Sequence, residues 1–477
     1  FFILGIFSAL LFPPFFMVPL GFIIFPYLIY LLSVISIKKN IFNYFSFGFL
    51  YGLGFLLVTL SWIFNPFLAN EETKNFATLG FSLPIFLSLF FGLGFSIYKY
   101  IFKKFYLIIF TPFIFLSIEF VISKIFYGFP WITYSLVNSN NILGFYLLKF
   151  FGSFVTSYLV LLIFIFPVIF VFSKKLEFKK IYIYYIHLPF LIAIIALLIL
   201  NLNKTEKIKK INLELFQIYS PINSINKKLI ETEIINKIIN SDSEYLIFAE
   251  NNYPYLISDI NTLSILRHIK DSQKVIIGAS REENGRFYNS FLYLEKNNVQ
   301  IFDKKILVPF GEFLPFRKYL KFMQIITGNV DYSLGNNPRL IVNNEINILP
   351  IICYEIIFNK ILKNINKKNI DLLINITNDS WFGNKIGPYQ HFYHSRMRAL
   401  ITNKYTIRVS NNGISAMIDN NGKIIQATKL NTRTSIKKTI KINNSIYFDF
   451  IHNFFNFYLI FIFFIYLILT YKLKHDK

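Results

Sequence analysis

The sequence is nearly devoid of cysteine, since Cys353 is the only one among 477 residues. A single thiol excludes a disulfide within the chain, and it also excludes a cysteine-rich metal cluster. Acidic residues are scarce too, with 26 Asp and Glu against 49 Lys and Arg, for a net charge of +23. The lysines occur together with abundant Asn, Ile and Phe, and no arginine–aromatic pattern or nucleic-acid motif accompanies them, so we expect no nucleic-acid partner.

Apolar residues are plentiful instead. They make up 54% of the chain, and Phe alone occurs 59 times. No ordinary soluble domain needs so much apolar surface, so we expect membrane spans of about 20 residues each. The opening segment lacks a charged start and a cleavage site, and is expected to be a retained span. Eight spans are predicted, at 1–12, 15–36, 42–64, 80–99, 105–123, 147–172, 183–201 and 453–471.

The pattern predicts three regions: a bundle of seven spans over 1–203, a water-soluble domain over 204–445, and a last span with its tail over 446–477. The middle region alternates polar segments with short β-rich runs such as "EYLIFAE" and "DLLINIT", which indicates an α/β domain. Lysines follow every second span, and the positive-inside rule then places both chain ends in the cytoplasm. Seven spans put the soluble domain on the opposite side of the membrane.

Reactive side chains stand beside β-like runs of this domain. Glu250 ends "EYLIFAE", Cys353 ends "INILPIIC", and Lys304 and Lys305 precede a predicted strand "ILV". Groups at strand ends project into a cleft while the sheet fixes their positions. Together a Glu, a Lys and a Cys can carry out acyl transfer, with the carboxylate as base, the thiolate as nucleophile and the ammonium stabilising the oxyanion. Taken singly, each is more often a solvated charge or a core residue.

Two histidines stand three residues apart on a predicted helix over 389–403. His391 and His394 occur in "HFYHSRMRAL". A metal site needs at least a third protein ligand at suitable spacing, and the sequence offers none. We therefore expect no metal and no cofactor.

Five motifs occur in an order and at separations that resemble one family: "LVPFGEFLPF", "ICYE", "NDSWFG", "HFYHSRMRAL" and "SNNG". They are similar to the carbon-nitrogen hydrolase (nitrilase) domain of apolipoprotein N-acyltransferases, and "GFPWITYS" resembles the membrane part of the same family. The resemblance covers nearly the whole chain. It implies a multi-span α-helical membrane bundle plus an α/β nitrilase-like domain, an αββα sandwich with helices on both sheets.

The resemblance also assigns catalytic roles. Glu250 matches the general base of a Glu-x-x-x-Pro motif that Pro254 completes, and Cys353 matches the nucleophile. Lys304 lies eight residues before the Glu of "GEF", which selects it over Lys305 as the family's lysine. The same resemblance therefore implies a Glu-Lys-Cys triad.

Supporting roles fall to residues near the triad or in the membrane part. Glu312 corresponds to an essential carboxylate near the thiol, and Tyr354 and Glu355 to neighbours that support the nucleophile. Trp131, in "GFPW", matches a position for substrate access or loop placement. Trp381, in "NDSWFG", is a candidate wall of an acyl cleft, and a purely structural role fits it equally well.

The function implied by the resemblance is a ping-pong acyl transfer. Cys353 would take an acyl chain from a phospholipid, typically phosphatidylethanolamine, and pass it to the α-amine of diacylglyceryl-cysteine on an apolipoprotein. The expected location is the bacterial inner membrane, with the catalytic domain of a monomer on the periplasmic side. Two alternatives stay open: a membrane-tethered amidase or nitrilase, and a transporter or scaffold with an inactive domain, for which the intramembrane Glu119 is the supporting charge.

Overall fold

The protein is described by a computed structural model. It covers residues 1–35, 39–68, 71–101, 104–171, 177–202, 208–219, 226–260, 263–320, 323–324, 328, 330–343, 345–443 and 445–475. The chain divides into two compact units. A helical unit comprises 1–61, 79–205 and 448–477, and a sandwich unit comprises 62–78 and 206–447. The short segment 62–78 therefore belongs to the sandwich, although apolar helices flank it in the sequence.

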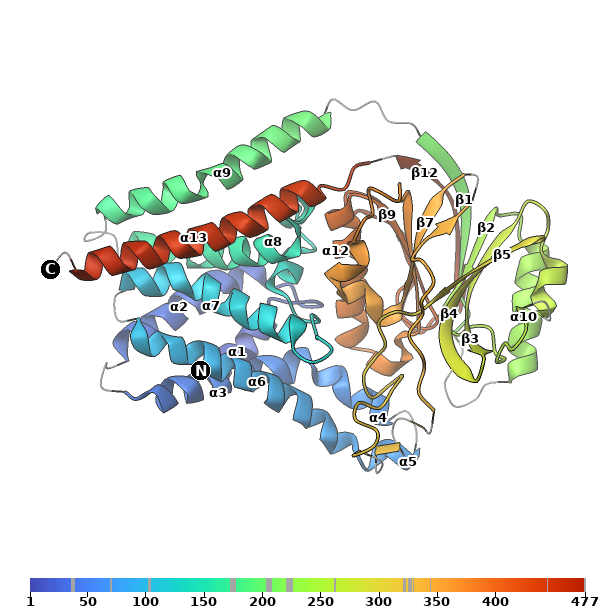
Figure 1. Ribbon diagram of the computed structural model, residues 1–477, viewed down its shortest axis with the longest axis horizontal. Coiled ribbons are helices and arrows are strands. Elements are labelled where there is room, and N and C mark those ends of the chain that lie inside the picture. The colour runs from blue at the N-terminus through green and yellow to red at the C-terminus, as the bar shows by residue number, and fades with distance from the viewer. Residues whose placement is uncertain are drawn as a thin grey trace. The chain divides into compact units, whose positions relative to one another are not determined.

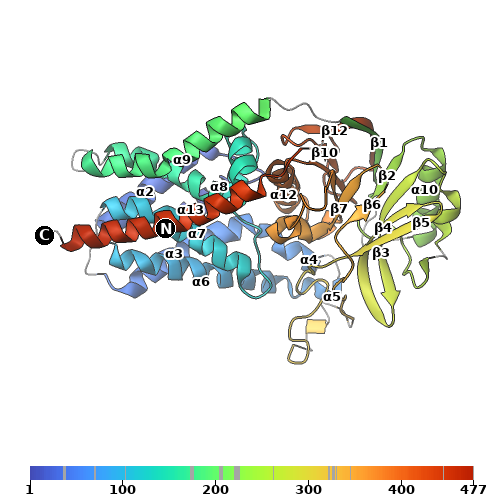
Figure 2. The same ribbon diagram turned by 45° about the horizontal axis from the view of Figure 1, so that its top comes forward.

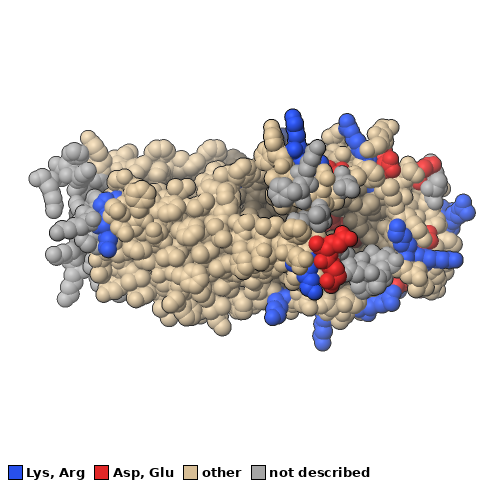
Figure 3. Space-filling view, turned by 90° about the horizontal axis from the view of Figure 1, so that it is seen from below, with Lys and Arg blue, Asp and Glu red and all other residues tan. Residues whose placement is uncertain are grey.

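Long apolar helices build the helical unit (Figure 1). Their bounds are α1 (Phe2–Ala9), α2 (Gly21–Val34), α3 (Ile41–Thr59), α6 (Ser82–Ser96), α7 (Lys104–Lys124), α8 (Ile142–Val171), α9 (Glu177–Leu202) and α13 (Asp449–His475). The face of this unit seen in Figure 3 carries almost no charged residue between its ends. Helices that are apolar all round need an apolar surrounding, so the predicted membrane bundle is confirmed as a fold class.

The number of crossings stays a prediction. Among the described residues, five stretches are long and apolar enough to span a bilayer: Ile41–Thr59, Ala77–Tyr100, Leu107–Lys124, Ile142–Val168 and Asp449–Ile468. Val18–Val34 and Ile186–Ile199 are shorter apolar helices. With eight residues, α1 is about 12 Å long, well short of a hydrocarbon core of about 30 Å.

Glycines allow α3 to pack closely on α6. A Cβ added at Gly48 would lie 2.3 Å from the carbonyl oxygen of Phe91, and one at Gly52 would lie 2.7 Å from the Cβ of Phe91. Small residues at a helix interface let two backbones approach, which is how helices associate without a hydrophobic driving force. The tight packing of this pair thus follows from the glycines of "FGFLYGLG".

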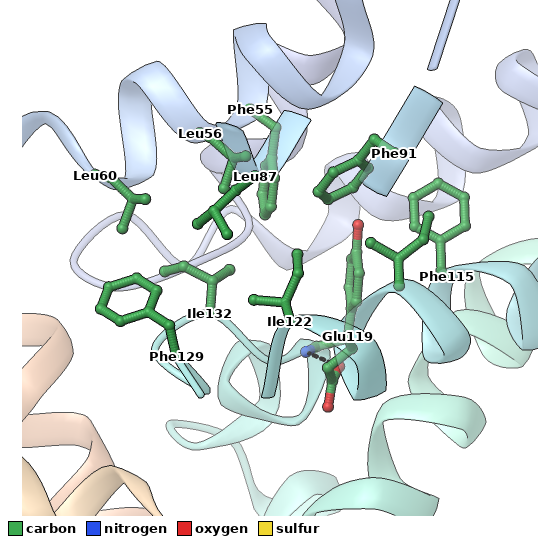
Figure 4. A pocket seen from close by; sticks show the side chains of 12 residues that line it. Phe55, Leu56, Leu60, Leu87, Phe91, Phe115, Glu119, Ile122, Phe129 and Ile132 are labelled. Carbon is green, nitrogen blue, oxygen red and sulfur yellow. Dashed lines mark hydrogen bonds between the residues drawn. The ribbon is translucent and has the colours of Figure 1, made fainter. Parts of the chain in front are cut away.

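The carboxylate of Glu119 ties three parts of the helical unit together. Its Oε2 accepts a hydrogen bond from the backbone N–H of Tyr134 at 3.0 Å, and its Oε1 accepts one from Ser157 Oγ at 3.0 Å. Figure 4 shows Glu119 at the edge of a small pocket lined by apolar side chains from α3, α6, α7 and the loop after α7. One oxygen thus anchors the segment between α7 and α8 that follows "GFPW" and the other bonds to α8, which accounts for this intramembrane charge without a transport pathway.

Two six-stranded sheets form the centre of the sandwich unit. The first has the order β12-β1-β2-β3-β4-β5, and the second has the order β11-β10-β9-β8-β7-β6. The strands of the first sheet are β1 (Ile208–Gln217), β2 (Tyr245–Phe248), β3 (Lys274–Glu283), β4 (Arg286–Glu295), β5 (Asn298–Asp303) and β12 (Thr434–Asn443). Those of the second are β6 (Ile341–Val342), β7 (Asn347–Ile352), β8 (Leu372–Thr377), β9 (Tyr405–Ser410), β10 (Ala416–Ile418) and β11 (Ile424–Ala427).

Helices cover the outer faces of both sheets, which confirms the αββα sandwich. In Figures 1 and 2, α10 (Lys227–Asn240) lies on the first sheet and α12 (Gly387–Thr402) lies against the second. Ile234 and Ile238 of α10 pack into the core over the first sheet, and Phe392 and Ala399 of α12 pack against β10. Strands buried on both faces are mostly apolar, as "LLINIT" is. The segment 62–78 adds two short helices, α4 (Asn65–Leu68) and α5 (Glu71–Lys74).

Local signals explain where the predicted helices begin and end. Asn226 caps α10, because its side chain accepts a hydrogen bond from the N–H of Leu229 at 3.2 Å. The helix α12 ends at Asn403, whose φ of +54° is left-handed. One strand prediction is wrong: "ILV" at 306–308 is irregular, and the strand beside the lysines is β5, which precedes them. The irregular turn lets the N–H of Val308 donate to Glu312 Oε2 at 2.8 Å.

Candidate active site

Glu250, Lys304 and Cys353 lie together, each just beyond the end of a strand. Glu250 follows β2, Lys304 follows β5 and Cys353 follows β7. Lys304 Nζ is 3.5 Å from Glu250 Oε1, and the Cys353 thiol is close enough for the charges of both groups to act on its pKa. All three residues are buried. The sandwich thus brings together a carboxylate, an ammonium and a thiol that are 103 positions apart at most in the sequence.

Lys304 lies between two carboxylates. Besides Glu250, its Nζ contacts Glu312 Oε1 at 2.9 Å. Burial alone would lower the pKa of Lys304, but the charges of Glu312 and Glu250 raise it above its ordinary value, so the residue is an ammonium. Lys305 instead sends its Nζ to the carbonyl oxygen of Asn336 at 3.4 Å, in an exposed position. Only the first of the two lysines therefore enters the cluster.

Asn289 of β4 bridges the two carboxylates. Its Nδ2 donates to Glu250 Oε1 at 2.8 Å and to Glu312 Oε1 at 2.7 Å. The backbone N–H of Lys304 also donates to the carbonyl oxygen of Asn289 at 2.8 Å. Asn289 thus fixes the distance between both acids and the lysine.

The proton of the site rests on the thiol. Burial and the charge of Glu250 raise the pKa of Cys353 above its ordinary value of 9.0, and Lys304 offsets this only in part. Burial and the charge of Glu312 also raise the pKa of Glu250 above its ordinary 4.5, while Lys304 and the hydrogen bond from Asn289 work in the opposite direction. The site thus holds a thiol beside the carboxyl group of Glu250 and the ammonium of Lys304. Such a site can move the thiol proton to Glu250 as sulfur attacks an electrophile.

Two neighbours hold Glu250 in place. Its Oε2 accepts a hydrogen bond from the backbone N–H of Asn378 at 2.8 Å. On the other side, a Cβ added at Gly278 of β3 would lie 2.5 Å from the Cα of Glu250. A glycine at position 278 is therefore required for Glu250 to reach its place beside the lysine.

The backbone of Cys353 is strained and is held by its carbonyl. Its φ of +48° is unusual for a residue with a Cβ. The Cys353 carbonyl oxygen accepts hydrogen bonds from His391 Nε2 at 3.2 Å and from Asn375 Nδ2 at 3.5 Å. These two hydrogen bonds help to hold Cys353, directly after β7, in its strained positive-φ conformation.

Asp379 and Arg408 orient His391. His391 Nδ1 lies 2.9 Å from Asp379 Oδ1, and Arg408 pairs with Asp379 Oδ2 at 2.5 Å. A Cβ at Gly413, in "SNNG", would overlap Asp379, so this glycine makes room for the acid. Within the described part of the chain, no three His, Cys, Asp or Glu side chains are grouped as metal ligands. His391 thus supports the nucleophile's backbone.

Glu355 ties the nucleophile's strand to the turn after Lys304. It pairs with Arg339 through two contacts of 2.6 and 2.8 Å, and it accepts hydrogen bonds from the N–H groups of Lys305, Ile306 and Ile352. Burial alone would raise the pKa of Glu355, but Arg339 and these donors hold it below its ordinary value. Glu355 is therefore an anion that positions the backbone on both sides of the site.

Comparisons with known proteins agree over both units. Residues 4–166 match the family model described as apolipoprotein N-acyltransferase N-terminal domain, and residues 247–445 match the carbon-nitrogen hydrolase model. An apolipoprotein N-acyltransferase from Rickettsia typhi is 30% identical over 464 residues, which cover 90% of this chain and 89% of the relative. One from Wigglesworthia glossinidia brevipalpis is 33% identical over 429 residues, covering 83% and 82%. The chain belongs to the apolipoprotein N-acyltransferase family.

Among solved structures, the Saccharomyces cerevisiae member of branch 10 of the nitrilase superfamily aligns with 17% identity and a TM-score of 0.39, covering 48% of this chain and 90% of its own. Family membership confirms the resemblance stated from the motifs. The apolipoprotein N-acyltransferase family is a family of acyltransferases, so the chain is an enzyme of this class and a membrane protein.

The aromatic candidates differ in exposure. Trp131 is fully buried in the helical unit and stacks on Phe129 with ring centres 6.0 Å apart, which favours loop placement over contact with a substrate. Tyr354 is also buried, and its ring meets the edge of Phe358 at 5.1 Å. Trp381 is 40% exposed, as a cleft wall requires, and its role stays a prediction.

The groups near the triad that were missed from the sequence include Asn289, and His391 in its supporting role. The available signal for Asn289 was a polar amide at the start of the mostly apolar run "NSFLYL". The next residue, Ser290, is also polar, and its Oγ donates to Asp303. For His391 it was the histidine at the start of a helix that follows "NDSWFG". Neither signal specifies which partner the side chain meets, because both partners come from distant strands.

Proposed function

We propose that this chain transfers an acyl chain from a phospholipid, through a thioester on Cys353, to the α-amine of diacylglyceryl-cysteine at the N-terminus of an apolipoprotein. Membership of the apolipoprotein N-acyltransferase family supports the reaction. The single observation that carries the mechanism is the buried cluster of Glu250, Lys304 and Cys353, in which Lys304 Nζ lies 3.5 Å from Glu250 Oε1. An apolar helical unit in the same chain suits two membrane-anchored substrates.

In the first half of the reaction, the thiol proton passes to Glu250 as sulfur bonds to the ester carbonyl carbon of the phospholipid. The carbonyl oxygen becomes an oxyanion, which the Lys304 ammonium stabilises. When this intermediate collapses, the carbon–oxygen ester bond breaks and the leaving alkoxide takes the proton from Glu250. The products are a lysophospholipid and the Cys353 thioester.

In the second half, the free α-amine attacks the thioester carbonyl carbon. Glu250 takes a proton from the amine, the carbon–sulfur bond breaks, and the thiolate recovers a proton, so the enzyme returns to its starting state. A thiolate leaves readily toward an amine, which makes the thioester a suitable intermediate. Water competes for the same carbonyl, and the burial of Glu250, Lys304 and Cys353 limits its access.

The finer assignments belong to the same proposal. Phosphatidylethanolamine is the proposed donor, and Glu312, Asn289 and Glu355 are proposed to position the triad. The alternating lysine-rich loops support an inner-membrane enzyme whose sandwich unit faces the periplasm. We propose that the enzyme acts as a monomer without a cofactor.

A transfer assay tests the function. The detergent-solubilised full chain is incubated with phosphatidylethanolamine carrying a labelled sn-1 acyl chain and a diacylglyceryl-cysteine peptide with a free α-amine. We expect label on the peptide with the wild type and none with Cys353→Ala. An amidase would release ammonia from small amides and leave the peptide unlabelled, and that result would contradict the proposal.

A further inference from the structure

The segment 62–78 belongs to the sandwich unit, although it leaves the helical unit after Ser61 and rejoins it at Leu79. It is folded back on itself, because Thr73 Oγ1 donates to the carbonyl oxygen of Phe67 at 2.7 Å. Family membership assigns no role to its side chains. Its contacts with the sandwich concentrate on one turn, the 3₁₀ segment Asp379–Phe382 with its flanks Asn378 and Gly383.

Trp62 packs between this turn and the first turn of α12. Its ring meets that of Phe382 edge to face, with centres 4.9 Å apart, and its Nε1 donates to Oε1 of the buried Gln390 at 3.2 Å. A Cβ added at Gly387 would lie 2.8 Å from the Trp62 ring, so this glycine makes room for the indole. Trp62 is 5% exposed, which means that it is used as a packed side chain within the sandwich.

Asn65 fixes the backbone of the same turn. Its Nδ2 donates to the carbonyl oxygen of Phe382 at 3.2 Å and to that of Trp62 at 2.9 Å. Gly383 has a φ of +70°, and a Cβ there would lie 2.4 Å from Asn65 Nδ2. The glycine of "NDSWFG" is thus needed both for its left-handed backbone and for the close approach of Asn65.

The turn held in this way contacts the base directly and reaches the nucleophile through His391. The N–H of Asn378 donates to Glu250 Oε2 at 2.8 Å. Asp379 orients His391, which holds the carbonyl of Cys353, and the ring of Phe382 lies 5.1 Å from that of His391. A shift of the turn would therefore move the base and the nucleophile at the same time.

We propose that Trp62 and Asn65 form a clamp that positions the 378–383 turn, and through it Glu250 and Cys353, for acyl transfer. The assignment rests on the proposed function of the Glu-Lys-Cys site. Trp62 and Asn65 are positioning residues, since neither contacts the reacting atoms. The clamp also makes the catalytic turn depend on a segment that continues directly into the apolar helices on either side of it.

The chain offers a matched pair of variants and an unambiguous probe. Asn65→Asp keeps the shape of the side chain but cannot donate to the two carbonyls, whereas Asn75→Asp makes the same change at an exposed position of the same segment. Because Cys353 is the only cysteine, alkylation by iodoacetamide reports on this thiol alone. Acyl-enzyme formation from labelled phosphatidylethanolamine, alkylation at fixed pH and the melting temperature are measured on the full chain in detergent.

We expect Asn65→Asp to slow acylation at saturating phospholipid about tenfold or more, because displacements near 1 Å at a reacting centre cost up to about 100-fold. The phospholipid concentration that gives half the maximal acylation rate should differ by no more than about twofold between Asn65→Asp and Asn75→Asp. The reason is that Asn65→Asp moves catalytic groups and removes no lipid contact. Trp62→Phe keeps the ring and loses the hydrogen bond to Gln390. It should slow acylation less, with a melting temperature lowered by a few degrees, because it leaves a small cavity and an unpaired Gln390 oxygen.

Equal maximal acylation rates for Asn65→Asp and Asn75→Asp would overturn the clamp. The clamp would also be overturned if, in both Asn65→Asp and Trp62→Phe, the acylation rate fell only in proportion to the fraction of unfolded protein. If phospholipid fails to acylate even the wild type, the proposed function is wrong. The clamp is then tested by alkylation alone, where slower labelling of Asn65→Asp than of Asn75→Asp supports it and equal labelling refutes it.

Discussion

Replacing Lys304 by methionine removes the ammonium that lies between two buried carboxylates. Lys304 Nζ is 3.5 Å from Glu250 and 2.9 Å from Glu312, and the lysine side chain is 1% exposed. Without it, Asn289 Nδ2 is left between two acids that repel each other, and one of them takes up a proton. The positive charge that lowers the pKa of Glu250 is also lost. Glu250 in this variant would be protonated over a wider pH range and could not serve as a base.

The size of the effect follows from the burial. Removing one partner of a buried ion pair costs about 3–5 kcal/mol of folding free energy. For a unit of this size, that lowers the melting temperature by roughly 10 °C. Loss of one preorganised oxyanion donor alone slows acylation by about 100- to 1,000-fold, and the loss of the base adds to this.

Lys305→Met is the matched control, because it deletes the adjacent lysine, whose Nζ contacts only the carbonyl oxygen of Asn336 among the described residues. Thermal unfolding in detergent and acyl-enzyme formation are measured for both variants. We expect Lys304→Met to be destabilised and unable to acylate, and Lys305→Met to resemble the wild type. The reverse ranking would refute the choice of lysine and the assigned pairing.

Three further predictions concern the groups around the triad. Gly278→Ala should slow acylation by about tenfold or more, because its Cβ would lie 2.5 Å from the Cα of Glu250 and displace the base; a wild-type rate would contradict this. Alkylation of Cys353 should still accelerate above pH 9, since burial and Glu250 raise the thiol pKa above 9.0, and a plateau below pH 7 would instead indicate a preformed thiolate. Arg339→Leu leaves the buried Glu355 unpaired and should lower the melting temperature at pH 7. This difference should shrink as pH falls below 4.5, because the folded-state pKa of Glu355 is depressed and the wild type loses that stabilisation when Glu355 is protonated; a constant difference would argue against the ion pair.

Much of the site could be predicted because its members end strands with clear patterns. The runs before Glu250 and Cys353 are apolar and short, and β2 and β7 end next to them. The helix α12 carries a local end signal at Asn403 and lies close to its predicted bounds of 389–403. The choice of Lys304 over Lys305 came from a motif spacing, and the structure places Lys304 in the cluster.

The parts that could not be predicted depend on contacts between distant segments. Asn289 meets Glu250 across 39 residues, and Trp62 meets Gln390 across 328. Composition and periodicity report on which face of an element is buried, but they carry no information about which buried polar groups become partners. The segment 62–78 begins inside the predicted span 42–64 and lies within the predicted bundle 1–203, so nothing in the sequence assigned it to the sandwich.

The central claim is that Cys353 carries the acyl chain as a thioester. Mass spectrometry of the Cys353 peptide, after the full chain is mixed with phosphatidylethanolamine in detergent and no acceptor, tests it directly. We predict a mass increase of one acyl group on Cys353 that hydroxylamine removes, and a much smaller yield with Glu250→Gln. An unmodified Cys353 peptide alongside active transfer to the acceptor, or an acyl group on another residue, would contradict the account.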